Sequence, residues 1–279
     1  MAYRCCRYQR GLESTPFQVK IDRNGAPTGR LVGMVVGVDN YIEPHLKLNY
    51  ASLDARRMKK SLEENSRLEY SDVRITELLN NDASGETIVS ELTRIAHDAS
   101  KDDTLLFFFS GHGFKDDAGH YRLTPKEFLS TELSRTGLEW SRIGSVLRAS
   151  KGRVVVILDA CHSGQSGADE AANDQVSDAL AEVKAPMIIL SAAKGRQFAY
   201  EDIPNQSTKF GGGAFTFALT NLLGPGRAAA DKNNNGSLEV SEIYSALKDT
   251  IVKETASHWR GVQTPWLEQR NVVGDFVLF

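Results

Sequence analysis

The sequence predicts an α/β fold in which a mostly parallel, six-stranded sheet has helices on both faces. Short apolar runs alternate along the chain with segments whose apolar residues recur at helical spacing. Several runs are almost continuously apolar, as strands are when helices cover both faces of a sheet. Alternating strands and helices build β-α-β crossovers, which connect parallel strands.

The strands follow from these runs in order. The run LVGMVVGV at 31–38 predicts a buried first strand, and VRITELL at 73–79 predicts a second with alternating exposure. The runs TLLFFF, RVVVIL, PMIIL and DFVLF predict the remaining four strands, at 104–109, 153–158, 186–190 and 275–279.

Helices are expected between these strands. Ser52 is placed to cap a helix whose inner face is formed by Ala55, Met58 and Leu62. Asp82 or Ser84 begins a second helix, with an inner face of Ile88, Leu92, Ile95 and Ala99. Further helices are expected at 139–149, 213–223 and 240–256.

Residues 1–29 lie outside this alternation, so we predict an N-terminal extension at 1–29 and one domain at 30–279. Within the extension, residues 17–21 alternate before a turn sequence and predict an accessory strand. Residues 165–185 are small and polar and predict a long exposed connection.

Composition excludes several classes of protein. The 279 residues hold 33 Lys+Arg and 36 Asp+Glu, a net charge of −3, which argues against a nucleic-acid binder and against a polybasic membrane-surface protein. The three cysteines are Cys5, Cys6 and Cys161, an odd number unlike a secreted disulfide framework. The basic N-terminus has no apolar segment typical of a secretory signal, so we expect a cytoplasmic protein with a loose N-terminal tail.

Two predicted strand ends carry reactive side chains. The third strand leads into His112, and the fourth leads into Cys161. Carboxyl ends of parallel strands meet at one edge of a sheet, where an imidazole could take the proton of a thiol. The flanking glycines permit tight turns, and the N–H groups of Gly113 and Cys161 are candidates to stabilise an oxyanion. The alternative is an inert buried cysteine with a hydrogen-bonded histidine.

The segments FSGHG at 109–113 and DACHSG at 159–164 resemble the histidine and cysteine segments of caspase-like cysteine peptidases, in the metacaspase and bacterial orthocaspase branch. Their histidine and cysteine lie 49 residues apart, close to the spacing in caspases. GVDNY at 37–41 and QTP at 263–265 are similar to further segments of that family. The resemblance covers residues 30–279 and implies a caspase-like fold and a catalytic dyad of Cys161 and His112.

The resemblance also bears on specificity. Animal caspases, which cleave after aspartate, have a glutamine where this chain has Asp159, and an arginine in the first loop that residues 39–53 lack. In metacaspases the matching acids line the specificity pocket, which implies Asp54 and Asp159 here, with Ser110 beside them and Ser191 in the substrate loop. Two carboxylates in a partly desolvated pocket favour a cation, so cleavage after Arg or Lys is expected. Asp54 could instead complement its helix dipole, and Asp159 could be structural.

Residues 231–242 match an EF-hand loop, with Asp231, Asn233, Asn235 and Glu242 at ligand positions that suit Ca²⁺. GPG at 224–226 interrupts the chain shortly before, so the entering helix is expected to be missing, and two ligands are neutral. The favoured alternative is an Asx-rich turn that caps the following helix. No cofactor is expected to be required, and calcium remains possible.

Two other metal sites are weaker. Asp116 and Asp117, which follow the histidine segment, are a second calcium candidate. A zinc site of His112, Cys161 and His162 lacks the paired ligand spacing of a structural zinc centre.

The expected partners are protein or peptide substrates and an upstream activating protease, with no nucleic acid and no membrane. Caspase relatives are often zymogens cut after the nucleophile strand, here at 165–185, where Lys184 is the basic residue. A monomer is favoured over a dimer. The alternatives are an inactive caspase-fold interaction module and a calcium-responsive binding module. A nucleotide binder is disfavoured because no glycine-rich loop follows the first strand.

Overall fold

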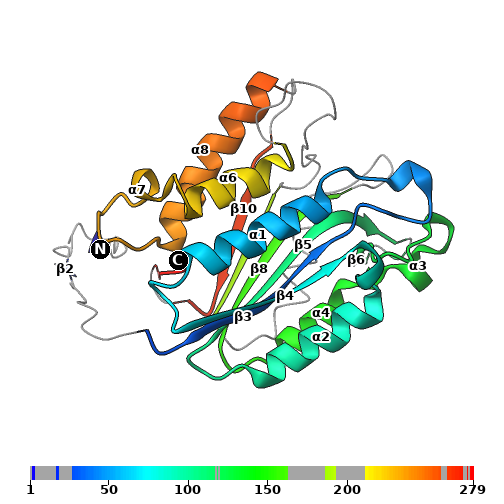
Figure 1. The fold of residues 1–279 in the computed structure, drawn as a ribbon, viewed down its shortest axis with the longest axis horizontal. Helices are drawn as coiled ribbons and strands as arrows, with labels where there is room; N and C mark the ends of the chain where they lie inside the picture. The colour runs from blue at the N-terminus through cyan, green and yellow to red at the C-terminus, as the bar shows by residue number, and fades with distance from the viewer. Residues whose placement is uncertain are drawn as a thin grey trace, which may run out of the picture.

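The computed structural model describes residues 2–3, 17–18, 27–116, 118, 120–162, 186–192, 211–258, 263–272, 275 and 277–279. Its central sheet follows the strand order β10-β9-β8-β5-β3-β4 (Figure 1). These strands are β3 (Arg30–Gly37), β4 (Asp72–Leu79), β5 (Thr104–Lys115), β8 (Arg153–His162), β9 (Met187–Ser191) and β10 (Trp266–Arg270). All neighbours along this path are parallel except β10 and β9. The predicted mostly parallel α/β sheet is therefore confirmed, but within the described residues it has eight strands rather than six.

Smaller strands extend this architecture. β6 (Tyr121–Leu123) pairs antiparallel with the far end of β5, and β7 (Leu138–Glu139) pairs with β6. In the N-terminal region, β1 (Ala2–Tyr3) pairs with β2 (Phe17–Gln18). An accessory strand was expected at 17–21, and residues 17–18, the part of it that the structure describes, do form a strand. The division of the chain at residue 30 stays a prediction.

Helices cover both faces of the sheet, as predicted (Figure 1). One face carries α1 (Ala51–Asn65), α6 (Ala214–Leu223) and α8 (Val240–His258), and the other carries α2 (Gly85–Asp98) and α4 (Trp140–Leu147). The short helices are α3 (Leu133–Thr136), α7 (Arg227–Ala230), η1 (Pro44–Leu46), η2 (Asn80–Asp82) and η3 (Ser130–Glu132).

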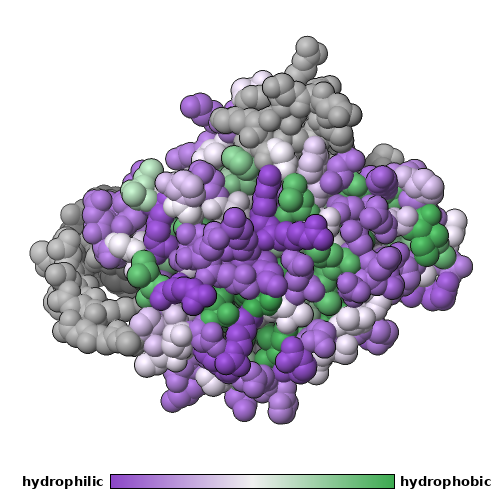
Figure 2. Space-filling view, in the orientation of Figure 1, coloured by the Kyte–Doolittle hydropathy of each residue, from purple (hydrophilic) through white to green (hydrophobic). Residues whose placement is uncertain are grey.

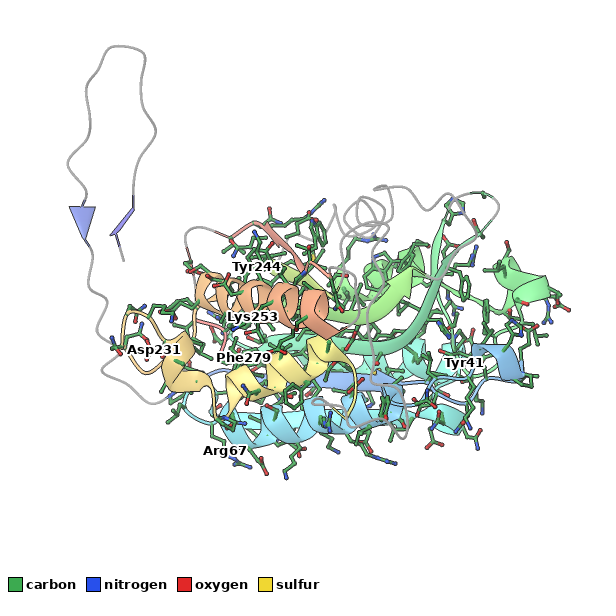
Figure 3. All side chains as sticks on the ribbon, turned by 90° about the horizontal axis from the view of Figure 1, so that it is seen from above. Tyr41, Arg67, Asp231, Tyr244, Lys253 and Phe279 are labelled. Atoms are coloured by element: carbon green, nitrogen blue, oxygen red, sulfur yellow. The ribbon has the colours of Figure 1, made fainter. Side chains whose placement is uncertain are left out.

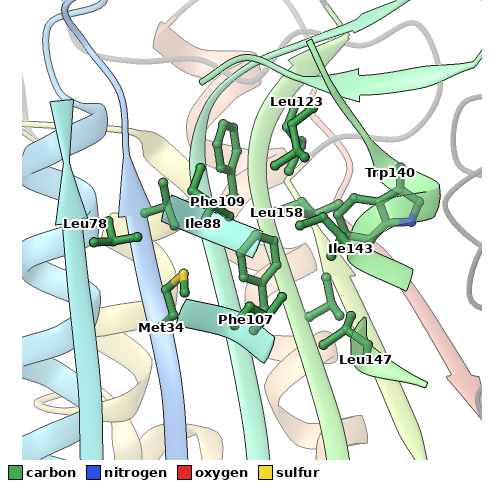
Figure 4. Close-up of a cluster of buried hydrophobic side chains, with 14 of the residues drawn as sticks. Met34, Leu78, Ile88, Phe107, Phe109, Leu123, Trp140, Ile143, Leu147 and Leu158 are labelled. Carbon is green, nitrogen blue, oxygen red and sulfur yellow. The ribbon is translucent and has the colours of Figure 1, made fainter. Parts of the chain in front are cut away.

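The alternation of β5 supplies both cores. Phe107 and Phe109 are fully buried against α2 and α4, where Trp140 and Ile143 join them (Figure 4). Leu106 and Phe108 point to the opposite face and its three helices. Burial of β5 on both faces explains why residues 105–109 are continuously apolar, and it fixes the strand that carries His112.

Two helix starts show how local sequence sets the boundaries. Of the two predicted starts, Asp82 and Ser84, it is Ser84 that caps α2, because its side chain accepts the N–H of Thr87 at 3.1 Å. Ser52 was expected to cap α1, but it lies inside that helix, which begins at Ala51. Its N–H instead donates to both carboxylate oxygens of Asp39, which follows β3.

The expected last strand at 275–279 is wrong. Val277 forms only an isolated bridge to Glu239, and Leu278 and Phe279 are buried beneath α8. This apolar run therefore fills the core, while the half-buried strand β10 completes the sheet edge.

The face shown in Figure 2 is mainly hydrophilic, with hydrophobic residues in small separate areas. The large hydrophobic residues that stand exposed within the described ranges are Ile42 and Leu68. None of the helices that the structure describes is both long and apolar enough to cross a membrane.

Candidate active site

The register of β5 and β8 brings the two predicted catalytic positions together. His112 is the direct partner of Cys161 in this parallel pair, two residues beyond the partnership of Ser110 with Asp159. Adjacent strands lie about 4.8 Å apart, so the main chains at His112 and Cys161 are one strand spacing from each other. Neighbouring residues in register lie on the same face of a sheet, and so do residues two apart. The four positions thus share one face at one end of the sheet.

Both positions lie within strands, whereas the sequence predicted turns beyond the strand ends. β5 continues through His112 to Lys115, and β8 continues through Cys161 to His162. The pairing between these two strands holds their ends in extended conformation past the last pairs with β3 and β9. Strand geometry, rather than a pair of loops, sets the spacing of the candidate dyad.

The imidazole of His112 has a defined hydrogen-bond partner. Its Nε2 lies 2.8 Å from the carbonyl oxygen of Leu46, the last residue of η1. A carbonyl only accepts, so Nε2 carries the hydrogen and Nδ1 is the basic nitrogen of the neutral ring. The rings of Tyr41 and Phe114 lie 5.3 and 6.0 Å from the imidazole, centroid to centroid. Burial lowers the pKa of His112 below its ordinary value, which keeps the ring neutral.

The main chain of Gly113 faces β8, where Gly113 pairs with His162. Thr124 donates its N–H to the carbonyl of His112 at 3.1 Å, which makes the next pair, Gly113 with Leu123, a non-hydrogen-bonded pair. The N–H of Gly113 therefore points away from β6, on the side of β8 and Cys161. The oxyanion roles of the Gly113 and Cys161 N–H groups stay predictions.

The predicted acidic pair converges on one helix terminus. Asp54 in the first turn of α1 is 2% exposed, and Asp159 in β8 is 8% exposed. The N–H of Gly213, just before α6, lies 3.0 and 3.2 Å from the carboxylate oxygens of Asp54. Asp159 accepts the N–H and the hydroxyl of Thr216 in the first turn of the same helix, at 3.2 and 2.5 Å. The dipole of α6 favours both negative charges.

Gly213 shows how close the two carboxylates come. A Cβ at this residue would stand 2.8 Å from an oxygen of Asp54 and 2.8 Å from an oxygen of Asp159. Only glycine fits between them without displacing one. Burial raises the pKa of Asp159 to about 6, against the opposing hydrogen bonds from Thr216.

The remaining predicted substrate residues are buried near this end of the sheet. Ser110 is 4% exposed and lies beside Asp159 in the register. Ser191 is 3% exposed, ends β9 and pairs with Leu158 and Trp266. The next residue of that loop, Ala192, accepts a 2.8 Å hydrogen bond from the side-chain amide of Gln263. The connection at 165–185 with Lys184, the later substrate loop, and the side chains of Cys161 and His162 lie outside the described residues.

The EF-hand-like loop lies far from this site, since Asp231 and Tyr41 are at opposite ends of the molecule (Figure 3). Asp231 accepts the N–H groups of Asn235 and Gly236 at 3.1 and 2.8 Å. Glu242 accepts the N–H groups at Lys232 and Asn233, at 2.8 and 3.2 Å. The ligand oxygens therefore already cap their own loop.

The chain is interrupted at 224–226 as expected, since α6 ends at Leu223, and only the single turn α7, which ends at Ala230, precedes this loop before α8 begins at Val240. Asp116, the other calcium candidate, forms an ion pair in which its carboxylate lies 2.7 Å from Nε of Arg122. Asp117 lies outside the described residues. Among the residues that the structure describes, no three His, Cys, Asp or Glu side chains gather into a metal site. Calcium binding stays a prediction.

Sequence reasoning missed three parts of the site. Leu46 contributes through its carbonyl, which no residue type could reveal. Tyr41 belongs to the segment GVDNY but had been given no role. The triple glycine 211–213 immediately before the helix predicted at 213–223 was the available signal for the close approach at α6.

A sheet with this strand order, covered by helices on both faces and ending in a histidine and a cysteine in register, defines a caspase-like α/β protein. A family model described as a caspase domain matches residues 30–277, so the chain belongs to the caspase family of peptidases.

Comparison with solved structures supports the fold. The protein GSU0716 from Geobacter sulfurreducens is similar with a TM-score of 0.60, over 88% of this chain and 95% of that chain. Its sequence identity is 18%, so the likeness concerns the fold alone. No curated protein gives a significant match to the sequence.

Proposed function

We propose that this protein is a cysteine endopeptidase that uses a dyad of Cys161 and His112 and cleaves after Arg or Lys. The observation that carries the proposal is the direct pairing of His112 with Cys161 across β5 and β8. This pairing sets the main chains of the two residues one strand spacing apart at the carboxyl end of parallel strands, and the imidazole has a defined tautomer. Membership of the caspase family supports a peptidase in general.

The reaction begins with a proton transfer from the Cys161 thiol to Nδ1 of His112, while Nε2–H stays on the Leu46 carbonyl. The thiolate attacks the peptide carbonyl, forming a carbon–sulfur bond and placing negative charge on the carbonyl oxygen. The N–H groups of Gly113 and Cys161 stabilise this oxyanion. His112 returns the proton to the leaving amine as the carbon–nitrogen bond breaks. Water, deprotonated by His112, then cleaves the thioester and restores the thiol.

The acidic pair is proposed as the specificity pocket. Asp54 and Asp159 are both buried, and the N-terminus of α6 satisfies some of their acceptor sites. An ionised carboxylate accepts from a guanidinium or an ammonium in charge-assisted hydrogen bonds. A substrate guanidinium or ammonium would compensate the concentrated negative charge, whereas an aspartate side chain would add to it. These acids also favour the metacaspase and orthocaspase branch over animal caspases.

Ser110 and Ser191 are proposed as further substrate contacts, through their place at the same end of the sheet. Activation of a zymogen is proposed at the connection 165–185, by self-cleavage or by another protease. An enzyme that is fully active while mass spectrometry shows one intact chain would contradict this part of the proposal.

The proposal is tested with fluorogenic peptides that end in Arg, Lys, Asp or citrulline, which has the length of arginine without its charge. Wild type should turn over the Arg and Lys peptides, and Cys161→Ala and His112→Ala should not. Cys5→Ala and His97→Ala are matched controls, because Cys5 lies in the predicted extension and His97 is exposed on α2. Full activity of Cys161→Ala would overturn the dyad. Turnover of the Asp peptide alone would overturn the specificity.

The other outcome of this experiment is a chain with no turnover of any peptide. A correctly folded wild type that remains inactive after cleavage in the connection would be an inactive caspase-fold interaction module. A cytoplasmic, monomeric enzyme acting on protein substrates remains part of the proposal.

A further inference from the structure

We propose that Tyr41 and Thr124 are positioning residues that hold the main chain of His112 through a closed circuit of hydrogen bonds. This inference rests on the proposed role of His112 as the catalytic base. It concerns the two hydroxyl groups and the N–H and carbonyl of His112, none of which takes part in the proton transfers themselves.

Four atoms form the circuit. The N–H of His112 donates to the Tyr41 hydroxyl at 3.1 Å, and that hydroxyl lies 2.9 Å from the Thr124 hydroxyl. The Thr124 hydroxyl in turn lies 2.9 Å from the carbonyl oxygen of His112. A carbonyl can only accept, so Thr124 donates to His112, which leaves Tyr41 to donate to Thr124. Each hydroxyl donates once and accepts once, and the directions are fixed around the ring.

The circuit supplies the hydrogen-bond partners that β3 would give to β5 if the two strands were still paired at His112. β3 pairs with β5 only as far as Gly37 and Ser110, so beyond Ser110 the strand β5 has lost this neighbour. An extended main chain needs a hydrogen-bond partner on that side when it is buried. The Tyr41 hydroxyl supplies the acceptor for His112, and Thr124, which follows β6, supplies both hydroxyl and N–H to its carbonyl.

Burial makes this circuit stiff. Tyr41 is 9% exposed and Thr124 is fully buried, so water competes little with either hydroxyl. The Tyr41 ring also packs beside the imidazole, and the same connection between β3 and α1 supplies the Leu46 carbonyl to Nε2. One connection therefore fixes His112 at its main chain through Tyr41 and at its ring through Leu46.

The glycines beside His112 are explained by the same contacts. A Cβ on Gly111 would stand 2.9 Å from the Tyr41 hydroxyl, and a Cβ on Gly113 would stand 2.1 Å from the hydroxyl of Tyr121. The sequence suggested that these glycines permit tight turns. In the structure both lie within β5, where they make room for tyrosine hydroxyls on either side of the histidine.

The test uses variants that remove one hydroxyl and keep the shape. Tyr41→Phe and Thr124→Val should each lower kcat for the Arg peptide by about 10- to 100-fold, since a misplaced catalytic group costs rate rather than binding. KM should change by less than about threefold, because neither hydroxyl is proposed to touch substrate. Thr124→Ser keeps the hydroxyl and should retain most of the activity. Tyr244→Phe is the matched control, since its hydroxyl donates to the Pro265 carbonyl elsewhere.

A pH profile separates positioning from general loss of folded protein. Loosening the circuit should admit water to the imidazole, so the acid limb of kcat/KM should move to higher pH in Tyr41→Phe and Thr124→Val. A smaller active fraction would lower the whole profile without moving it. Thermal unfolding checks that each variant is folded.

The outcomes distinguish this inference from the proposed function. If Tyr41→Phe and Thr124→Val match wild type in kcat and pH profile while Cys161→Ala is inactive, the positioning role is wrong and the dyad stands. If Cys161→Ala is as active as wild type, the proposed function itself fails. If Tyr41→Phe does not fold, the test rests on the comparison of Thr124→Val with Thr124→Ser. Equal activity in these two variants would overturn the inference.

Discussion

The carboxylates of Asp54 and Asp159 meet at the N-terminus of α6, although one comes from the first turn of α1 and the other from β8. An oxygen of each carboxylate lies 2.8 Å from the position that a Cβ of Gly213 would occupy. The guanidinium of Arg57 also comes close, since a Cβ on Gly212 would stand 2.5 Å from its Nη1 and 2.6 Å from an oxygen of Asp54. The family resemblance implied these two acids together, and their carboxylates do come close in the structure; the next two predictions depend on this arrangement.

Asp159→Asn should remove the preference for a charged substrate residue. We expect the ratio of kcat/KM for the Arg peptide over the citrulline peptide to fall on the order of a hundredfold, because a buried charge pair loses one partner. Asparagine keeps an oxygen that can accept from Thr216, so the start of α6 is preserved. Asp116→Asn, which removes a buried carboxylate paired with Arg122, is the matched control and should leave the ratio unchanged. An unchanged ratio in Asp159→Asn would contradict the pocket assignment.

The same carboxyl should give the selectivity a pH dependence. Burial raises the pKa of Asp159 from 3.8 to about 6, so the pocket carries its full charge only above about pH 6. The Arg-to-citrulline ratio of kcat/KM should therefore rise between pH 5 and pH 7 with a midpoint near 6. Titration of the dyad affects both peptides alike and cancels in the ratio. A ratio that is flat across this range in wild type would exclude Asp159 as the titrating group.

The ion pair of Arg30 with Asp103 should contribute stability that depends on pH. Asp103 is 2% exposed and accepts the N–H of Arg30 and its Nη2, each at 2.7 Å, and the N–H of Ser100 at 2.8 Å. Burial alone would raise the pKa of Asp103, but these hydrogen bonds hold it well below its usual range. Asp103→Asn should lower the free energy of unfolding by about 3 kcal/mol at pH 7.

The effect of Asp103→Asn should shrink as pH falls below about 4, where the unfolded carboxylate becomes protonated and the stabilisation fades. Glu91→Gln is the control, because its pairing with Arg94 is on the surface of α2 and is worth at most about 0.5 kcal/mol. Chemical denaturation at several pH values measures both variants. A pH-independent difference between wild type and Asp103→Asn would show that the charge is not the cause.

The loop 231–242 should act as a capping structure. Asp231→Ala removes the acceptor for two loop N–H groups and should lower the free energy of unfolding by about 1 kcal/mol, equally with calcium and with chelator. Asp249→Ala, further along α8, is the control and should have little effect. If calcium raises the Tm of wild type and not that of Asp231→Ala, the loop binds calcium and the capping interpretation is wrong.

The sequence alone was sufficient to predict the strands and helices that have a clear pattern of apolar residues. The continuous apolar runs of β3, β5 and β8 and the periodic faces of α1 and α2 predicted the sheet and its covering helices. The run at 275–279 was misassigned, because an apolar pentapeptide can fill a core as well as form a strand. The half-buried β10 gave no comparable signal.

The candidate site also contains residues that the sequence could suggest and others that it could not. His112 and Cys161 could be proposed from residue types at strand ends, and Asp54 and Asp159 from the resemblance to metacaspases. The Leu46 carbonyl and the approach of Gly213 to the acids depend on main-chain positions set by tertiary packing, which residue types do not encode. Tyr41 and Thr124 lie more than 80 residues apart in sequence and meet only because β6 folds back on β5.

The most direct test of the central claim is covalent labelling with a peptidyl chloromethyl ketone that ends in arginine, followed by peptide mapping. An activated thiol in an acidic pocket should give one adduct on Cys161, with Cys5 and Cys6 unmodified. His112→Ala should slow this labelling at least tenfold, and an otherwise identical reagent ending in aspartate should not label. Labelling of Cys161 that is indifferent to His112 and to the arginine, or labelling confined to Cys5 and Cys6, would contradict the account.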